Sequence, residues 1–241
     1  MSTKVIKINE PALSAESGVK QLFVGIDVHK KSWTVSIHTD LFEHKTFSQP
    51  PDSKKLVEYI RDRFPGYSVQ CAYEAGFSGY WLQRQLQQAG MPCLVVNPAD
   101  IPTTDKESKY KEDKRDSRKI ANQLRSGNLN GIYTPDPKQE QLRSFFRQRN
   151  NMVKDLRRSK SRIKSLLLYY GTTIPVQYDN NNWSKNFIKW LQEIKTEHPT
   201  LASSLQSMLR QFEFLRKEKL GTELDLRTYV RKEYSTDYYL L

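Results

Sequence analysis

The stretch Leu22-Phe23-Val24-Gly25-Ile26-Asp27 decides the fold of this chain. It is a short, nearly continuous apolar run that ends in an acid, a pattern typical of a buried β-strand. Residues 69–74, Val-Gln-Cys-Ala-Tyr-Glu, repeat this pattern and also end in a carboxylate. Because ligands of α/β folds gather at the carboxyl ends of strands, Asp27 and Glu74 are the first candidate site residues.

The segments around these two runs alternate between strand and helix patterns. Further short strands are predicted at residues 33–37, 45–48 and 93–96. Apolar residues recur at helical spacing after Asp52 or Ser53 and again after Ser78, which are candidate helix caps. Three strands followed by alternating helix and strand predict an α/β fold with a mixed sheet and helices on its faces.

The second half of the chain has a helical pattern. A helix is predicted from about Asp113 to Arg125, and residues 138–170 contain neither proline nor glycine and carry apolar residues at alternating three- and four-residue steps. This predicts a long helix that could pair as a coiled coil. Residues 184–232 predict two more amphipathic helices, split near Pro199. We therefore expect a flexible segment 1–20, an α/β domain 21–132 and a helical region 138–241.

The charge of the chain favours a polyanionic partner. Lys and Arg total 39 against 27 Asp and Glu, which gives a net charge of +12. Basic proteins bind nucleic acid because each neutralised phosphate releases counterions. Cys71 and Cys93 lie in apolar runs and are expected to be buried free thiols, and the absence of a Cys/His cluster argues against zinc. No apolar run has the length of a signal peptide or a membrane span, so we expect a cytoplasmic protein with no membrane partner.

Four carboxylates are candidate metal ligands and catalytic residues: Asp27, Glu74, Asp113 and Asp116. The last two are three residues apart, so on a helix they share a face, although Glu112 competes with Asp113 for the role. Oxygen ligands suit Mg²⁺, with Mn²⁺ as an alternative, and two such ions are a known solution for phosphodiester chemistry. The alternative is that these acids cap helices, form turns or compensate a helix dipole, and spacing alone does not decide.

The predicted helix 138–170 carries ten Lys/Arg and two acids, so it holds two thirds of the excess positive charge. The candidate nucleic-acid-binding residues on it are Arg143, Arg147, Arg149, Arg157, Arg158 and Arg162. The alternative is a charged coiled-coil exterior with no ligand. His29, next to the first acid, is expected to be a surface histidine rather than a substrate contact.

Five short motifs, in order, carry a resemblance to a known family: Phe23-Val24-Gly25-Ile26-Asp27-Val28-His29-Lys30, Tyr73-Glu74-Ala75-Gly76, Val96-Asn97-Pro98, Lys111-Glu112-Asp113-Lys114-Arg115-Asp116 and Gly127-Asn128-Leu129. The chain resembles the insertion-sequence family 110 transposases, the DEDD transposases related to the Piv DNA invertase. The resemblance implies an RNase H-like, RuvC-like sheet, with Asp27 as the first acid, Glu74 as the second, and Asp113 and Asp116 as the final pair. It also implies Mg²⁺, DNA cutting and joining, dimers or higher assemblies, and in some members a structured guide RNA.

The chain departs from the family pattern in two places. Ser117 follows the last acid where the family usually has alanine, and the family continues into a second domain with a nucleophilic serine. We therefore expect the catalytic N-terminal part of a DNA transposase that is truncated before the C-terminal domain. The alternative is a catalytically incomplete nucleic-acid-binding and dimerisation module. A sugar-kinase-like or actin-like ATPase is disfavoured, because the 10 glycines form no second phosphate loop.

Overall fold

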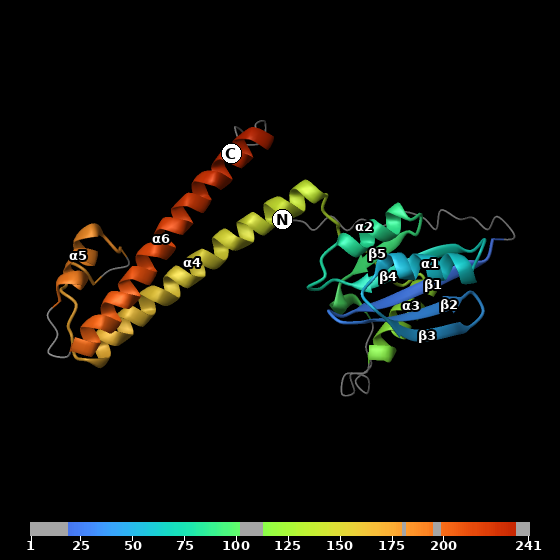
Figure 1. Cartoon of the computed structure of the whole chain (residues 1–241), viewed down its shortest axis with the longest axis horizontal. Helices are drawn as coiled ribbons and strands as arrows, with labels where there is room; N and C mark the ends of the chain where they lie inside the picture. Colours follow the sequence, from blue (N-terminus) through green and yellow to red (C-terminus); the bar gives the residue numbers. More distant parts are fainter. Residues whose placement is uncertain (1–18, 102–112, 180–181, 195–198, 235–241) are drawn as a thin grey trace. The chain divides into compact units, whose positions relative to one another are not determined.

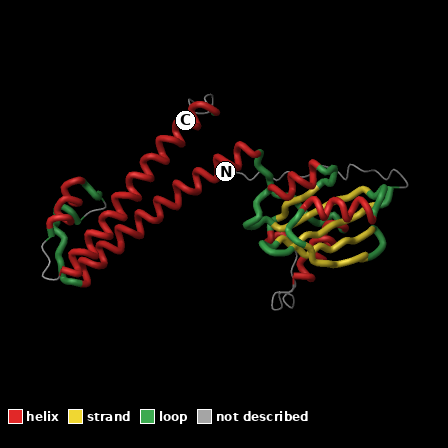
Figure 2. The backbone as a smooth tube through the Cα atoms, viewed as in Figure 1, coloured by secondary structure: helices red, strands yellow, loops and turns green. Residues whose placement is uncertain are grey.

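The computed structural model describes residues 19–101, 113–179, 182–194 and 199–234. The chain divides into two compact units, residues 1–134 and residues 135–241. Among the described residues, the strands all lie in the first unit, and the second unit contains helices and loops (Figures 1 and 2). Residues 1–18 of the expected flexible segment, and Glu112, lie outside the described residues.

The first unit contains a five-stranded mixed sheet, which confirms the predicted α/β class. Its strands are β1 (Gln21–Val28), β2 (Trp33–Thr39), β3 (Glu43–Gln49), β4 (Ser68–Glu74) and β5 (Cys93–Val96). They lie in the order β3-β2-β1-β4-β5. β1 pairs with β2, and β2 with β3, in antiparallel fashion, whereas β4 is parallel to both β1 and β5. This arrangement is consistent with an RNase H-like sheet.

Helices cover both faces of the sheet because its central strands are apolar on both sides. Leu22, Val24 and Ile26 pack on one face with α1 (Ser53–Arg63) and α2 (Trp81–Gln88). Phe23, which points the other way, packs in a cluster with residues of α3 (Asp113–Arg125). Successive side chains along a strand point to opposite faces, so the sheet has an apolar cluster on each face. Among the described α-helices, α1 and α2 cover one face and α3 covers the other.

The predicted caps have different outcomes. Asp52 accepts hydrogen bonds from the backbone N–H groups of residues 54 and 55, so it caps α1 as expected. The prediction that Ser78 caps α2 is wrong. The helix begins at Trp81, and its N-cap residue is Tyr80, whose side chain forms no capping hydrogen bond. The reason is Gly79, whose φ of 61° is outside the helical region and separates Ser78 from the helix.

The second unit is built on two long helices, α4 (Pro137–Tyr169) and α6 (Pro199–Glu233), with α5 (Lys185–Glu193) packed beside them. The pair is antiparallel, because Lys138 forms an ion pair with Glu233 whereas Arg149 forms one with Glu223. Phe187 of α5 is fully buried in a core shared by the three helices. The long helix expected at 138–170 is confirmed, and its partner is α6 of the same chain; coiled-coil pairing between chains stays a prediction.

Two further expectations concern the cysteines and the membrane. Cys71 and Cys93 are buried free thiols, as predicted, and they face each other in the ladder of β4 and β5. Burial raises the pKa of Cys71 to about 12, which keeps the thiol protonated and unreactive. In the described part of the chain, no helix combines the length and the apolar character needed to cross a bilayer.

Candidate functional site

The parallel pairing of β1 and β4 sets two of the candidate acids side by side. Ile26 of β1 is paired with Tyr73 of β4 in the parallel register. The residues that follow them, Asp27 and Glu74, therefore lie at neighbouring positions on adjacent strands. Neighbouring strands are about 4.8 Å apart. Both acids therefore lie at the carboxyl edge of the sheet, as expected from the sequence.

Both acids also point to the face of the sheet that α3 covers. A Cβ atom on Gly25 would collide with the backbone of α3 at Ser117 and Ala121, so residue 25 faces the helix. Because side chains two residues apart share a face of a strand, Asp27 faces the same way as Gly25. Ala72 packs in the α3 cluster, so the same argument places Glu74 on that face.

The direction of α3 brings its N-terminal end toward these acids. Its residue Leu124, near the C-terminal end, packs in the cluster of Phe23, whereas Ser117 lies over Gly25, two residues further along β1. The helix therefore runs antiparallel to β1, and the turn before Ser117 extends toward Asp27. That turn contains Asp113 and Asp116, and residue 113 is four positions before Ser117 on the same face of the helix.

The immediate partner of Asp27 is a histidine. The Nε2 atom of His29 is 3.0 Å from the Oδ2 atom of Asp27, so a ring with its proton on Nε2 donates a hydrogen bond to that carboxylate. The Asp27 side chain is 18% exposed and that of His29 is 47% exposed. The histidine is thus a surface residue, as expected, and in addition it orients the first acid.

The described acid side chains do not by themselves complete a metal site. Among the residues described, no three His, Cys, Asp or Glu side chains stand close enough together to hold an ion. The side chain of Asp113 lies outside this description, and Asp116 is half-buried. The donor set still fits a hard cation, since Asp27 and Glu74 offer adjacent carboxylate oxygens on one face. The four-acid site thus stays a prediction.

The surroundings of Ser117 provide hydrogen-bond partners for a hydroxyl side chain at this buried position. It is fully buried, and its Oγ atom is 2.8 Å from the Oγ of Ser36, which lies 2.8 Å from the Oγ1 of Thr46. The next residue, Arg118, forms an ion pair with Glu43 at 2.6 Å. A polar chain therefore ties α3 to β2 and β3, and the hydroxyl of Ser117 is hydrogen-bonded despite its burial.

The sequence did not predict these positioning residues. One signal was available: in residues 33–37 the polar side chains alternate with the apolar ones, which puts Ser36 on the face opposite Val35 and Ile37. Only the packing of α3 on that face shows which polar residue it meets.

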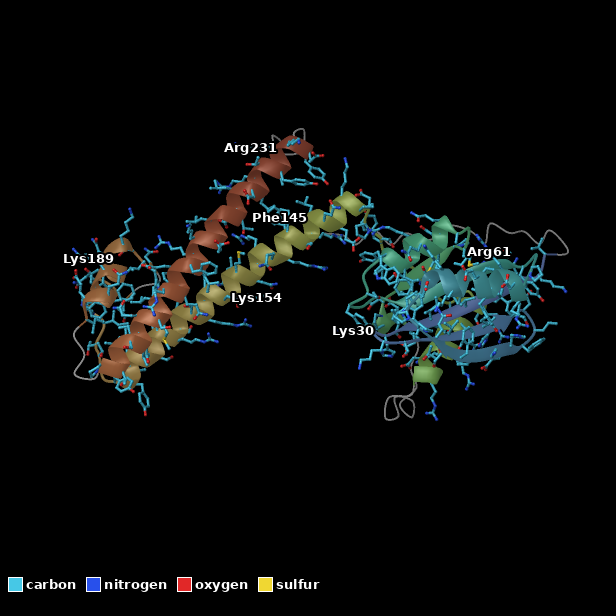
Figure 3. All side chains as sticks on the ribbon, viewed as in Figure 1. Lys30, Arg61, Phe145, Lys154, Lys189 and Arg231 are labelled. Atoms are coloured by element: carbon cyan, nitrogen blue, oxygen red, sulfur yellow. The ribbon has the colours of Figure 1, made fainter. Side chains whose placement is uncertain are left out.

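Six exposed cations of α4 form a stripe on one side of the helix. We call it the basic face, and its exposed members are Arg143, Arg147, Lys154, Arg157, Arg158 and Arg162. Most of them are separated by four or seven residues, so they share a helix face that spans about 28 Å. Figure 3 shows Lys154 pointing away from α6, whereas Phe145 lies on the side toward it. One acid adjoins the face, since Asp155 pairs with Arg158.

Arg149, also a candidate from the sequence, lies on another side of α4. Its Nη2 and Nε atoms donate to the Oε1 of Glu223 at 2.7 and 3.0 Å, and Lys219 contacts the other oxygen of that carboxylate. These hydrogen bonds lower the pKa of Glu223, with that from Lys219 the largest cause. The structure thus places five of the six candidate arginines on the basic face and the sixth between α4 and α6.

The comparison with protein families covers both candidate sites. Residues 24–171 match the family model DEDD_Tnp_IS110, described as a transposase. The chain belongs to this DEDD transposase family. The matched residues are more than half of the chain, and they include the four candidate acids and the whole of α4. The prediction of the family from five short motifs is confirmed.

Individual relatives resemble the chain over most of its length. A protein named "Putative transposase y4qE" from Sinorhizobium fredii is 28% identical over 201 residues, which cover 81% of this chain and 50% of the relative. The "Transposase for insertion sequence element IS1533" of Leptospira borgpetersenii is 30% identical over 182 residues, covering 73% of this chain and 51% of the relative. The chain therefore spans about half the length of these two relatives.

Proposed function

We propose that this chain supplies the catalytic, metal-dependent part of a DNA transposase. In this proposal Asp27, Glu74, Asp113 and Asp116 hold Mg²⁺, or Mn²⁺ in its place, at the carboxyl edge of the sheet. The observation that carries the proposal is the register of β1 and β4, which sets Asp27 and Glu74 level on the face toward which the start of α3 runs.

The divalent ions, when bound, would activate the attacking water or hydroxyl and stabilise the leaving oxygen of a phosphodiester. The chain's own residues do the positioning. Gly25 lets the backbone of α3 approach β1, and His29 holds one oxygen of Asp27 in place. The bond between Ser36 and Ser117 holds the start of α3 against the sheet, so the turn that carries its two acids lies toward the strand ends.

The second part of the proposal concerns the nucleic acid. The basic face of α4 binds a DNA backbone through its arginines, which form planar, permanently charged contacts with phosphate. A structured guide RNA is a second ligand of the same chemistry, and a homodimer or higher assembly would form through the helical region. These partners are expected from the excess of positive charge and from the family.

The experiment that tests the catalytic proposal compares the chain with its Asp27→Asn variant. We expect Mg²⁺-dependent nicking of a labelled DNA that carries the ends of the element, and we expect the variant to lose it while it still binds DNA. Asp62→Asn, which removes an exposed acid of α1 outside both candidate sites, is the matched control and should keep the activity. Equal nicking by the chain and by Asp27→Asn would refute the catalytic assignment.

A second candidate function is a nucleic-acid-binding and dimerisation module without catalysis. The observation in its favour is that the described acids form no group of three, whereas the cations of the basic face form a continuous stripe. Titration calorimetry with Mn²⁺ separates the two candidates. Heat that disappears in Asp27→Asn supports the metal site, and no heat with intact DNA binding supports the module.

A further inference from the structure

A groove in the second unit lies beside the basic face of α4. It has a volume of about 550 Å³, and it is lined by side chains of α4, of α6 and of the segment that leads into α5. Its lining includes four cations: Arg157, Lys160, Arg216 and Lys219. No acid is among the described lining residues, although Lys219 is compensated from outside by Glu223. Cations gathered in a recess produce a positive potential that attracts an anion.

Two of these cations are held around Trp183. The ammonium of Lys160 lies 5.6 Å from the centroid of the indole ring, and the Nη1 atom of Arg216 donates to the Trp183 carbonyl oxygen at 3.3 Å. Burial lowers the pKa of Lys160, and the neighbouring charges of Arg216 and Lys164 lower it further. The repulsion between like charges that are held close together decreases when an anion binds between them.

The start of α5 adds to the same potential. Asn182 and Ser184 line the groove, and the Oγ of Ser184 accepts a hydrogen bond from the N–H of Phe187 in the first turn. A helix N-terminus carries a partial positive charge that stabilises a nearby anion. Trp183 is only 7% exposed, so its ring is not open for a base to stack on it. The groove is therefore suited to a phosphate rather than to a nucleobase.

We propose that this groove binds a backbone phosphate of a single-stranded nucleic-acid segment that lies along the basic face of α4. Arg157 belongs to both surfaces, so a strand that crosses the basic face reaches the groove without a break. A single strand can turn one phosphate into a recess, whereas the regular backbone of a duplex cannot do so without bending. This inference rests on the proposed binding of nucleic acid by α4, and it adds a separate site.

The test measures the affinity of the chain and of Lys160→Gln for labelled single strands of DNA and RNA with one mixed sequence, and for the DNA duplex. We expect Lys160→Gln to weaken single-strand binding by about tenfold, since it removes a charged contact. The slope of log affinity against log salt should fall by about 0.7. Lys189→Gln, which removes an exposed lysine of α5 outside this groove, should change neither quantity. Unchanged melting temperatures would show that both variants fold.

A second measurement does not depend on the variant. Reductive methylation followed by mass spectrometry should show that the single strand protects Lys160 and leaves Lys189 reactive. A larger effect of Lys160→Gln on RNA affinity would assign the groove to RNA, a larger effect on DNA affinity would assign it to DNA, and equal effects would assign it to the shared phosphate.

The failures of the two proposals are distinguishable. If Lys160→Gln binds like the original chain and Lys160 stays reactive in the complex, the groove binds no phosphate. If in addition Arg143→Gln and Arg147→Gln do not weaken binding, the proposed role of α4 fails as well.

Discussion

The substitution Gly25→Ala tests how α3 is held against the sheet. A Cβ at position 25 would lie 3.0 Å from the Cα of Ala121 and closer still to the Ser117 carbonyl oxygen and the Ala121 nitrogen. All three are backbone atoms of α3, so no side chain can rotate to relieve the collision. Ordinary van der Waals contact begins at 3.4 Å, so the helix must move by more than 0.4 Å.

That movement separates α3 from a close-packed layer. Ile120, Ala121 and Leu124 are 5% exposed or less, and the bond between Ser36 and Ser117 is buried. Overpacking of this kind costs about 1–3 kcal/mol, and occasionally more. We expect about 3 kcal/mol, because backbone meets backbone and a buried hydrogen bond is stretched. For a unit of this size that lowers the melting temperature by about 10 °C.

The assay is thermal unfolding followed by circular dichroism, with two alanine controls. Gly76→Ala lies in the same unit with nothing within 4 Å of the new Cβ, and we expect a change within about 0.5 kcal/mol. Gly221→Ala lies inside α6, also in open space, and should stabilise its helix by up to about 1 kcal/mol. A Gly25→Ala variant that melts within about 2 °C of the original chain would refute the close approach of α3.

Three further predictions follow from particular interactions. Glu223→Gln should destabilise the second unit by about 1 kcal/mol. Because folding lowers the pKa of Glu223, its ionised side chain stabilises the unit above the unfolded pKa, and this stabilisation is lost as pH falls through the folded pKa. The melting temperature of the variant should therefore fall less steeply with decreasing pH in the acid range. Burial is the main cause of the lowered pKa of His38; the charge of Glu43 opposes the shift, and the charges of Arg125 and Arg118 reinforce it. Folding therefore disfavours the protonated ring, so the free energy of unfolding should fall as pH drops below the unfolded pKa of about 6.5, by at most about 1.4 kcal/mol per pH unit. His38→Gln should remove this pH dependence. Combined replacement of Arg143, Arg147 and Arg158 by Gln should reduce the slope of log affinity for duplex DNA against log salt by about 0.9 for each phosphate that the variant no longer neutralises. Arg149→Gln, which breaks the ion pair with Glu223, should lower the melting temperature and leave that slope unchanged.

The sheet was predictable from the sequence because its strands have strong local patterns. The apolar runs before Asp27 and Glu74 match β1 and β4, and their shared ending in an acid indicated one edge of a sheet. The apolar residues at alternating three- and four-residue steps in residues 138–170, a segment without glycine or proline, predicted α4. Each of these elements was predictable because its pattern of apolar and polar residues lies within a single continuous segment of the sequence.

Interactions between distant segments were not predictable in the same way. The start of α2 depends on the positive φ of Gly79, and nothing in the spacing of Ser78 from the apolar residues reveals it. The separation of Arg149 from the basic face depends on which side of α4 meets α6. The bond from Ser36 to Ser117 joins residues 81 positions apart, and it needs the direction of α3 to be known.

The catalytic account depends on the acids of β1, β4 and α3 sharing metal ions. The most direct test is a crystal of the chain soaked in Mn²⁺, with anomalous scattering used to locate the ion. The account predicts a peak about 2.1 Å from carboxylate oxygens of Asp27 and Glu74, with an acid of α3 as a further ligand, and no peak in Asp27→Asn. Ordered acids without a peak between them at saturating Mn²⁺ would contradict it.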